Sequence, residues 1–316
     1  MPTMKNPLKN TSCSVLRAGV LLLLGWSLTN TASALTFPLP APGNSVVGHV
    51  QWTQAQAGDT FSSIGRRYDI GYFELVEANP GIDADNVPAG TLIVIPSRFI
   101  LPPVPRKGIV LNLAELRVYY YPAGRGVVTT YPVGIGREGW MTPTGMNRIT
   151  EKTVNPTWVV PESIRTDRAK DGVFLPKLVP PGPDNPLGGY RMRLSQPTYL
   201  MHGTNDYTGV GRRSSSGCIR MYPEDVEVLF SNVKVGTQVN IVNDMYKAGW
   251  SGGKLYLETH VPLQEQQETS AVDISAMRSV VTAATQSHAG QLDWDTANGI
   301  AKQQSGIPQI VGYVTN

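Results

Sequence analysis

Alternation of apolar and polar residues dominates the middle of the chain and predicts a β-rich domain over residues 107–243. GIVLNLAELRVYYYP, VVTTYPVGIG and YRMRLSQPTYLMHGT all have the two-residue period of half-buried strands. We expect a mainly antiparallel sandwich or barrel. Residues 154–189 interrupt this pattern with many prolines and glycines. So long a segment indicates either a lid or substrate wall, or an ordered surface loop without function.

A shorter pattern precedes this domain, and it reads as strand, helix, helix, strand over residues 48–97. HVQWTQA and TLIVIP have strand character, while Phe61, Ile64 and Tyr68 recur at helical spacing between them. YFELVEAN predicts a second helix, which the following NPG ends. We expect a small α+β unit, followed by a stiff proline-rich linker over residues 98–106.

After residue 243 the pattern predicts one more hairpin through GGKLYLETHVPL. Two weakly amphipathic helices follow, around ISAMRSVVTAATQ and DWDTANGIAKQQSG. No motif in this part indicates chemistry. We therefore treat residues 244–316 as a C-terminal extension that packs on the main domain.

The first 34 residues have the pattern of a signal peptide. The apolar run AGVLLLLGWSL follows three basic residues, Lys5, Lys9 and Arg17. Ala32 and Ala34 then supply the small residues at which signal peptides are cut. An uncleaved membrane anchor is the alternative, but the run is short for a bilayer span. We expect cleavage after Ala34 and an exported protein.

Removal of the signal peptide changes both the charge and the cysteine content. The chain has 27 basic and 24 acidic residues, and the three basic residues of the leader account for the difference. The mature chain is formally neutral, which argues against nucleic-acid binding. Cys13 leaves with the leader, so Cys218 is the one cysteine that remains. A lone thiol in an oxidising compartment is either an inert buried residue or a reactive group.

The residues around Cys218 favour a reactive thiol. It lies in RSSSGCIRM, sixteen residues after His202, which closes the apolar strand YLMHGTN. A cysteine nucleophile requires such an imidazole to take the thiol proton and return it to the leaving group. Gly217 permits a turn that aims the amides of Gly217 and Cys218 at an oxyanion. The remaining histidines occur in ordinary strand or tail contexts: His49, His260 and His288.

Two family resemblances rest on these motifs. MHGTN, SSSGCIRM, GIGREGWMTPTG, PGPDNPLG and VYYYP resemble the YkuD-type L,D-transpeptidases, while GDTFSSI, EANPG and GTLIVIP resemble a LysM peptidoglycan-binding module. A small spacer domain is the alternative for the second unit. Together they resemble periplasmic enzymes of Gram-negative bacteria, which implies a YkuD-like fold and a periplasmic location. The domain plan is then signal peptide 1–34, LysM module 48–97, linker 98–106, catalytic domain 107–243 and extension 244–316.

The resemblance also implies roles for individual residues. Cys218 matches the nucleophile and His202 the proton donor and acceptor, with the Gly203 carbonyl orienting the imidazole and the Gly217 amide facing the oxyanion. Three further residues are expected at the substrate: Ser215, Ser216 and Arg220. Ser216 stands where the pattern most often has a second, accessory histidine, and this departure bears on acceptor preference and rate.

Arg220 has two readings. Its guanidinium can grip a stem carboxylate in two-pronged fashion, or it can form an ion pair with Asp225 or Glu224. Several aromatic residues likewise either line the pocket or belong to the core, namely Tyr190, Trp158 and the run Tyr119, Tyr120, Tyr121.

The family chemistry is acyl transfer from peptidoglycan. The resemblance implies that Cys218 attacks the third residue of a tetrapeptide stem, releases D-alanine and leaves a thioester. An amine of another stem then gives a 3-3 cross-link, and the terminal lysine of an outer-membrane lipoprotein gives a covalent anchor. Alternatives are an L,D-carboxypeptidase or cross-link hydrolase, in which water is the acceptor, and a non-catalytic peptidoglycan-binding protein. We expect no cofactor and no metal, because neither HExxH nor paired CxxC spacing occurs.

Overall fold

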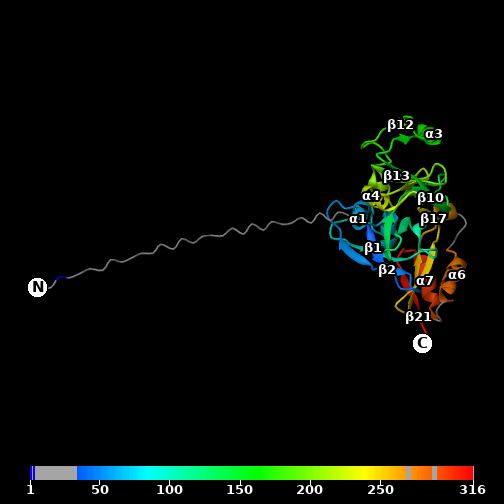
Figure 1. Cartoon of the computed structure of the whole chain (residues 1–316). Coiled ribbons are helices and arrows are strands. Elements are labelled where there is room, and N and C mark those ends of the chain that lie inside the picture. Colours follow the sequence, from blue (N-terminus) through cyan, green and yellow to red (C-terminus); the bar gives the residue numbers. More distant parts are fainter. Residues whose placement is uncertain (2, 4–33, 268–271, 287–289, 316) are drawn as a thin grey trace. The chain divides into compact units, whose positions relative to one another are not determined.

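The computed structural model of the chain describes residues 1, 3, 34–267, 272–286 and 290–315 (Figure 1). Apart from residues 1, 3 and 34, the predicted signal peptide lies outside these ranges. None of the helices in the described ranges has the length and apolar character needed to cross a bilayer.

A nine-stranded sheet forms the main structural element, in the order β1-β8-β7-β6-β17-β10-β13-β14-β16. Most neighbouring strands are antiparallel, but β17 runs parallel to β6 and β16 runs parallel to β14. The prediction of a mainly β fold is confirmed. The strand bounds are β1 Leu35–Pro38, β6 Gly108–Asn112, β7 Arg117–Tyr121, β8 Val127–Pro132, β10 Gly145–Val154, β13 Tyr190–Leu194, β14 Leu200–His202, β16 Ile219–Arg220 and β17 Gln238–Val242.

Both faces of this sheet are covered, which explains why β6 and β7 are buried almost throughout. Ile109 and Leu111 of β6 pack on one face with helix α4 (Pro223–Asn232). Val110, between them, points to the other face and packs with the N-terminal unit. Alternate residues of one strand therefore belong to two different cores.

The N-terminal unit has the predicted strand, helix, helix, strand order. Its elements are β3 (Gln51–Gln54), α1 (Phe61–Tyr68), α2 (Tyr72–Ala78) and β4 (Leu92–Ile95). Thr60 caps α1, accepting a hydrogen bond from the Ser63 amide at 3.1 Å. A second small pair joins β2 (Val46–Gly48) to β5 (Arg98–Ile100), so the segment predicted as a linker begins with a strand.

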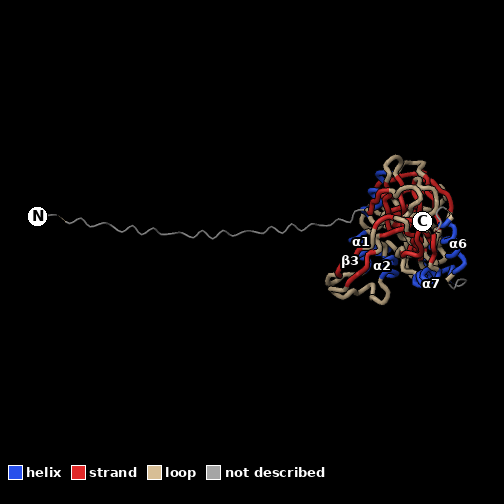
Figure 2. Tube along the Cα trace, turned by 90° about the horizontal axis from the view of Figure 1, so that it is seen from below, coloured by secondary structure: helices blue, strands red, loops and turns tan. Residues whose placement is uncertain are grey.

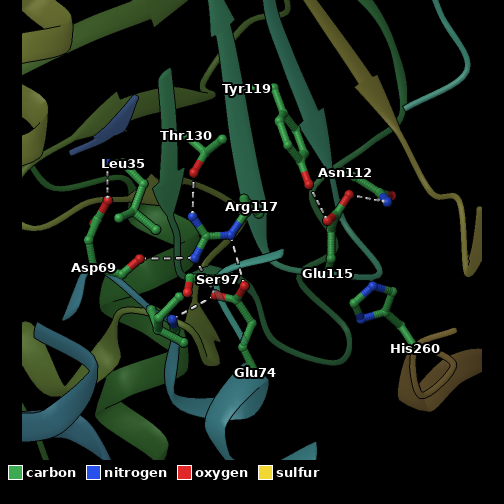
Figure 3. A network of polar contacts seen from close by, with 12 residues as sticks. Leu35, Asp69, Glu74, Ser97, Asn112, Glu115, Arg117, Tyr119, Thr130 and His260 are labelled. Atoms are coloured by element: carbon green, nitrogen blue, oxygen red, sulfur yellow. Dashed lines mark hydrogen bonds and ion pairs between the residues drawn. The ribbon is translucent and has the colours of Figure 1, made fainter. Parts of the chain in front are cut away.

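A buried ion pair attaches this unit to the main sheet (Figure 3). The fully buried guanidinium of Arg117, on β7, donates to both carboxylate oxygens of Glu74 on α2, at 2.8 and 2.9 Å. It also donates to Thr130 Oγ1 at 2.7 Å and to the Asp69 carbonyl at 3.0 Å. A second bidentate pair links Arg66 of α1 to Glu224 of α4. These bonds hold the unit in a fixed position on the sheet.

The C-terminal extension forms its own small layer of sheet and helices. The sheet has the order β18-β19-β21-β20, with bounds Tyr246–Ser251, Lys254–Thr259, Gln309–Val314 and Gly290–Leu292. The two predicted helices are α6 (Ile274–Thr285) and α7 (Trp294–Gln303), which contact each other (Figure 2). A short helix, α5 (Gln264–Gln267), precedes them. Strands β20 and β21 were not predicted.

Candidate active site

His202 ends a strand at one edge of the main sheet, and Cys218 directly precedes the neighbouring strand. β14 ends at His202, and β16 begins directly after Cys218. The two strands run parallel, with His202 opposite Arg220. Cys218 precedes Arg220 by two residues, and residues two apart on a strand face the same side. The pairing places His202 and Arg220 side by side, and the Arg220 charge acts on both the imidazole and the Cys218 thiol.

The imidazole of His202 is buried and has a defined tautomer. Its Nδ1 lies 2.5 Å from the Gly203 carbonyl oxygen, which can only accept, so Nδ1 carries the proton and Nε2 has a free lone pair. Burial, together with the positive charge of Arg220, lowers the pKa of His202 to about 4, although the Gly203 carbonyl opposes this shift. At neutral pH the imidazole is an uncharged base.

The thiol of Cys218 is half-buried and also uncharged at rest. Burial raises the pKa of the Cys218 thiol, against smaller opposing effects of the Leu200 backbone and the Arg220 charge. Its Sγ donates to the Thr198 carbonyl over 3.8 Å, which suits a protonated thiol. At neutral pH both the Cys218 thiol and the His202 imidazole are therefore uncharged.

The turn before Cys218 is shaped by glycine and fixed by hydroxyl groups. Gly217 has φ +99°, and a Cβ there would lie 2.9 Å from the Tyr199 ring. Ser215 Oγ donates to the Cys218 carbonyl at 2.6 Å. Ser216, between them, is half-buried. The serine–glycine segment thus positions the backbone on both sides of the thiol.

Thr142 is a site residue that sequence reasoning missed. Its buried hydroxyl donates to the Gly217 carbonyl at 2.8 Å and accepts from the Gly136 amide at 3.0 Å. Carbonyl and amide of a trans peptide point in opposite directions, so this bond turns the Cys218 amide away from Thr142. A threonine in a proline-containing loop has no periodic pattern, and the TPTG motif around it was the one available signal.

The Arg220 guanidinium is embedded beside the thiol and the imidazole. A Cβ at Gly209 would lie 2.1 Å from Arg220 Nη1, so glycine makes room for it, and Nη1 donates to Ser214 Oγ at 3.4 Å. Both alternative partners are engaged elsewhere, since Glu224 pairs with Arg66 and Asp225 contacts Asp69. In the described part of the chain, no carboxylate lies within ion-pair distance of Arg220.

The proline-rich segment 154–189 forms an arm that extends past β13 and α4 (Figure 1). It consists of the pair β11 (Trp158–Val159) and β12 (Leu178–Val179) with helix α3 (Glu162–Lys170), none of whose residues is buried. Burial lowers the pKa of Arg220. The charges of Asp206 and Cys218 oppose this shift, and a smaller effect of Arg168 on α3 adds to it. The arm thus brings a second guanidinium within electrostatic range of the site. It also exposes Phe174 to 84%.

The other aromatic candidates make their recorded side-chain contacts with residues other than Cys218. Tyr119, Tyr120 and Tyr121 are core residues of the sheet. The Tyr190 hydroxyl donates to Glu227 at 2.9 Å, and its ring contacts Phe230. Trp158 belongs to the arm.

One group among the described residues has the composition of a metal site, formed by Glu115, Glu258 and His260. The ammonium of Lys247 lies 2.8 Å from a carboxylate oxygen of each glutamate and occupies the place of a cation. His260 bridges Glu258 and Glu77, and although burial opposes it, these carboxylates raise the pKa of His260 to about 10. The cluster is a buried ionic network of two cations and three carboxylates that joins the N-terminal unit, the main sheet and the extension.

Comparison with known proteins places this geometry in context. Residues 106–241 match YkuD, the L,D-transpeptidase catalytic domain, and residues 54–96 match the LysM domain. The chain is 39% identical to the probable L,D-transpeptidase YcfS of Escherichia coli K12, over 89% of this chain and 90% of that protein. It is 37% identical to the probable L,D-transpeptidase YbiS of the same organism, over 95% and 98%. The probable L,D-transpeptidase ErfK/SrfK of Salmonella typhimurium is 36% identical, over 92% and 93%.

Proposed function

The chain belongs to the YkuD family of L,D-transpeptidases, and on this premise we propose that Cys218 is the nucleophile that transfers peptidoglycan stem peptides through a thioester. The observation that carries the proposal is the tautomer of His202. With Nδ1 donating to the Gly203 carbonyl, Nε2 is the nitrogen left to accept the thiol proton.

The first half-reaction forms the acyl-enzyme. Nε2 of His202 takes the proton as Sγ attacks the carbonyl carbon of the third stem residue. The Cys218 amide, turned by Thr142, and the Gly217 amide stabilise the oxyanion. The tetrahedral intermediate collapses when the C–N bond to the terminal D-alanine breaks, and the imidazolium protonates the departing amine.

The second half-reaction reverses these proton transfers. An acceptor amine attacks the thioester carbonyl, His202 takes its proton, and the C–S bond breaks to regenerate the thiol. We assign the amine of a second stem as one acceptor, which gives a 3-3 cross-link. The terminal lysine of an outer-membrane lipoprotein is the other, which gives an anchored protein.

Arg220 is the group we assign to a stem carboxylate, with the charge of Arg168 in support. A guanidinium without a carboxylate partner in the described ranges, set beside the nucleophile, is suited to an anionic substrate. Ser215 orders the turn through its bond to the Cys218 carbonyl, and we assign the half-buried Ser216 to contact with the stem peptide.

The remaining parts give the enzyme its location. We infer export to the periplasm with cleavage after Ala34, and attachment of the LysM module at residues 48–97 to the glycan strands. Both substrate and anchoring surface then belong to the same peptidoglycan layer.

The test is intact-mass spectrometry of the mature protein after exposure to a carbapenem, a β-lactam that acylates activated cysteines of this kind. We expect one adduct per chain in the wild type and none in Cys218→Ala. A reduced but unmodified wild-type thiol would refute the nucleophile assignment.

Incubation of the active protein with tetrapeptide stems, with and without a lysine-ended peptide, then identifies the acceptor. Release of D-alanine without a joined product would establish the carboxypeptidase instead.

A further inference from the structure

A pair of buried carboxyl groups lies where the N-terminal unit meets the main sheet. Asp69 follows helix α1 and Asp225 lies in the first turn of α4, and their exposures are 1% and 2%. The two groups interact directly. Burial raises the pKa of Asp69 to about 6, against the opposing charge of Arg117 and hydrogen bonds from Asp225 and Leu35. Burial also raises the pKa of Asp225, and the nearby Asp69 charge adds to this shift.

This carboxyl pair has too few donors and too little positive charge. A protonated Asp225 can donate to Asp69, but apart from this shared proton neither Asp69 Oδ1 nor Asp225 Oδ2 has an aligned hydrogen-bond donor among the described residues. The nearby guanidinium of Arg117 is already bonded to both oxygens of Glu74. An unsatisfied buried carboxylate is strongly disfavoured. The site therefore has the chemistry of a receptor for one more cation with several N–H donors.

The backbone nitrogen of Leu35 is already in contact with this pair. It donates to Asp69 Oδ2 at 3.0 Å (Figure 3). Strand β1, which begins at Leu35, holds the nitrogen in place through its pairing with β8, where Leu35 lies opposite Thr130. In the uncut chain this nitrogen is a neutral amide with one hydrogen. Leu35 is also the first residue after the predicted cleavage point at Ala34.

We propose that the Asp69–Asp225 pair is a binding site for the α-ammonium group of Leu35, which exists only after the leader is removed. Hydrolysis of the Ala34–Leu35 peptide bond consumes one water, leaves a carboxylate on Ala34 and an amine on Leu35, and the amine takes up a proton. The ammonium offers three donors, one for Asp69 Oδ2 and two for the oxygens that lack one. This inference rests on the export proposed above.

The consequence is that maturation stabilises the joint between the two domains. The carboxyl pair connects the end of α1 to α4, and Arg117 on β7 bonds both to Glu74 and to the Asp69 carbonyl. A precursor with an amide at this position lacks the charge that balances the pair. The processed chain therefore gains stability at the surface that holds the LysM module on the catalytic domain.

The experiment uses full-length protein, expressed with its leader and purified after export. Its mass establishes whether the chain starts at Leu35. An amine-reactive reagent at neutral pH then probes the α-amine, and tryptic mapping isolates it, because residues 35–66 contain no lysine. An ordinary α-amine is reactive here, with a pKa of about 8. We expect labelling at least tenfold slower than in a matched variant with Ser-Gln inserted between Ala34 and Leu35, an insertion that creates no new small-x-small cleavage site before Leu35.

Two further variants separate binding from simple burial. Asp69→Asn and Asp225→Asn, alone and combined, should restore fast labelling of the Leu35 amine. The insertion variant leaves both aspartates in place, so its labelling rate is measured on a chain with an unchanged carboxyl pair. The insertion should lower the denaturant midpoint of the chain that keeps both aspartates. In the chain with Asp69→Asn and Asp225→Asn, the same insertion should change the midpoint little. Equal labelling rates in wild type and insertion variant, or a mature chain starting elsewhere, would overturn the inference.

The carbapenem adduct on Cys218, measured on the same samples, keeps the two proposals apart. A protected Leu35 amine without an adduct refutes the catalytic assignment but not the ammonium site. An adduct with an unprotected amine refutes the ammonium site but not the catalytic assignment.

Discussion

Thr142→Val tests whether the turn before Cys218 is held by the hydroxyl that reaches it from the opposite loop. The substitution keeps the size and branching of the side chain and removes both hydrogen bonds, to the Gly217 carbonyl and from the Gly136 amide. Thr142 is 4% exposed, so water cannot easily replace the lost hydroxyl. The Gly217 carbonyl is then free to rotate, and the Cys218 amide rotates with it.

Two magnitudes follow from this geometry. Each buried backbone group left without a partner costs about 1–3 kcal/mol, so we expect a loss of about 2–6 kcal/mol in the free energy of unfolding. Deleting an oxyanion-hole donor slows catalysis about 100- to 1,000-fold, and a misdirected donor should cost less. We therefore expect acylation of Cys218 to slow by about 10- to 100-fold.

The assay is the second-order rate of carbapenem acylation, followed by intact mass, with thermal unfolding measured on the same samples. Thr142→Ser keeps the hydroxyl and should acylate at close to the wild-type rate. Thr144→Val, at an exposed position two residues away, controls for the loss of a threonine from this loop. A folded Thr142→Val protein that acylates as fast as Thr144→Val would refute the role of the hydroxyl.

Three other predictions address the base, the substrate clamp and the domain joint. Because burial and Arg220 lower the pKa of His202 to about 4, the imidazole remains a neutral base in mild acid. The rate of Cys218 acylation should therefore stay constant from pH 7 to below 6. A rate that falls to half near the ordinary histidine pKa of about 6.5 would contradict this. Arg220→Lys should raise KM for a tetrapeptide stem by about 10- to 100-fold, matching the 1.5–3 kcal/mol of charged hydrogen bonds, and steady-state kinetics showing a change in kcat alone would exclude a clamp. Arg117→Met leaves the buried Glu74 carboxylate without its partner and should lower the free energy of unfolding, measured by chemical denaturation, by about 3–5 kcal/mol. Arg117→Met combined with Glu74→Gln should recover part of this loss. Equal losses in both variants would show that the ion pair itself is unimportant.

The position of His202 and Cys218 at one sheet edge could be predicted from the sequence because local signals mark both residues. His202 ends an apolar strand and Cys218 follows a glycine turn, and neighbouring strand ends in one sheet commonly meet. The alternating pattern identified most strands of the main sheet for the same reason, since the period of a half-buried strand is visible within a few residues.

Buried charges could not be predicted in this way. Arg117 begins the run RVYYY and has the appearance of a solvent-facing strand residue, yet it is fully buried because Glu74, 43 residues earlier, arrives on another domain. Lys247 is buried against Glu115 across 132 residues of sequence. Periodicity says which side of a strand is apolar, but it cannot show that a partner from a distant segment neutralises a charge. The same limit applies to β20 and β21, which pair with each other only in the folded extension, so the local sequence pattern does not reveal them.

The buried ion pairs limit how the two functional parts can work together. Glu74 and Glu77 lie on one helix of the LysM module, and each is bonded to a different part of the remaining chain: Glu74 to Arg117 of the sheet, and Glu77 to His260 of the extension. Two separate attachments on one helix prevent rotation about either. The glycan-binding surface we assign to the module is therefore held at a fixed distance and orientation from Cys218. We expect such an enzyme to select stems by their position along the bound glycan strand, so loosening the joint should broaden that selection without altering the chemistry at the thiol.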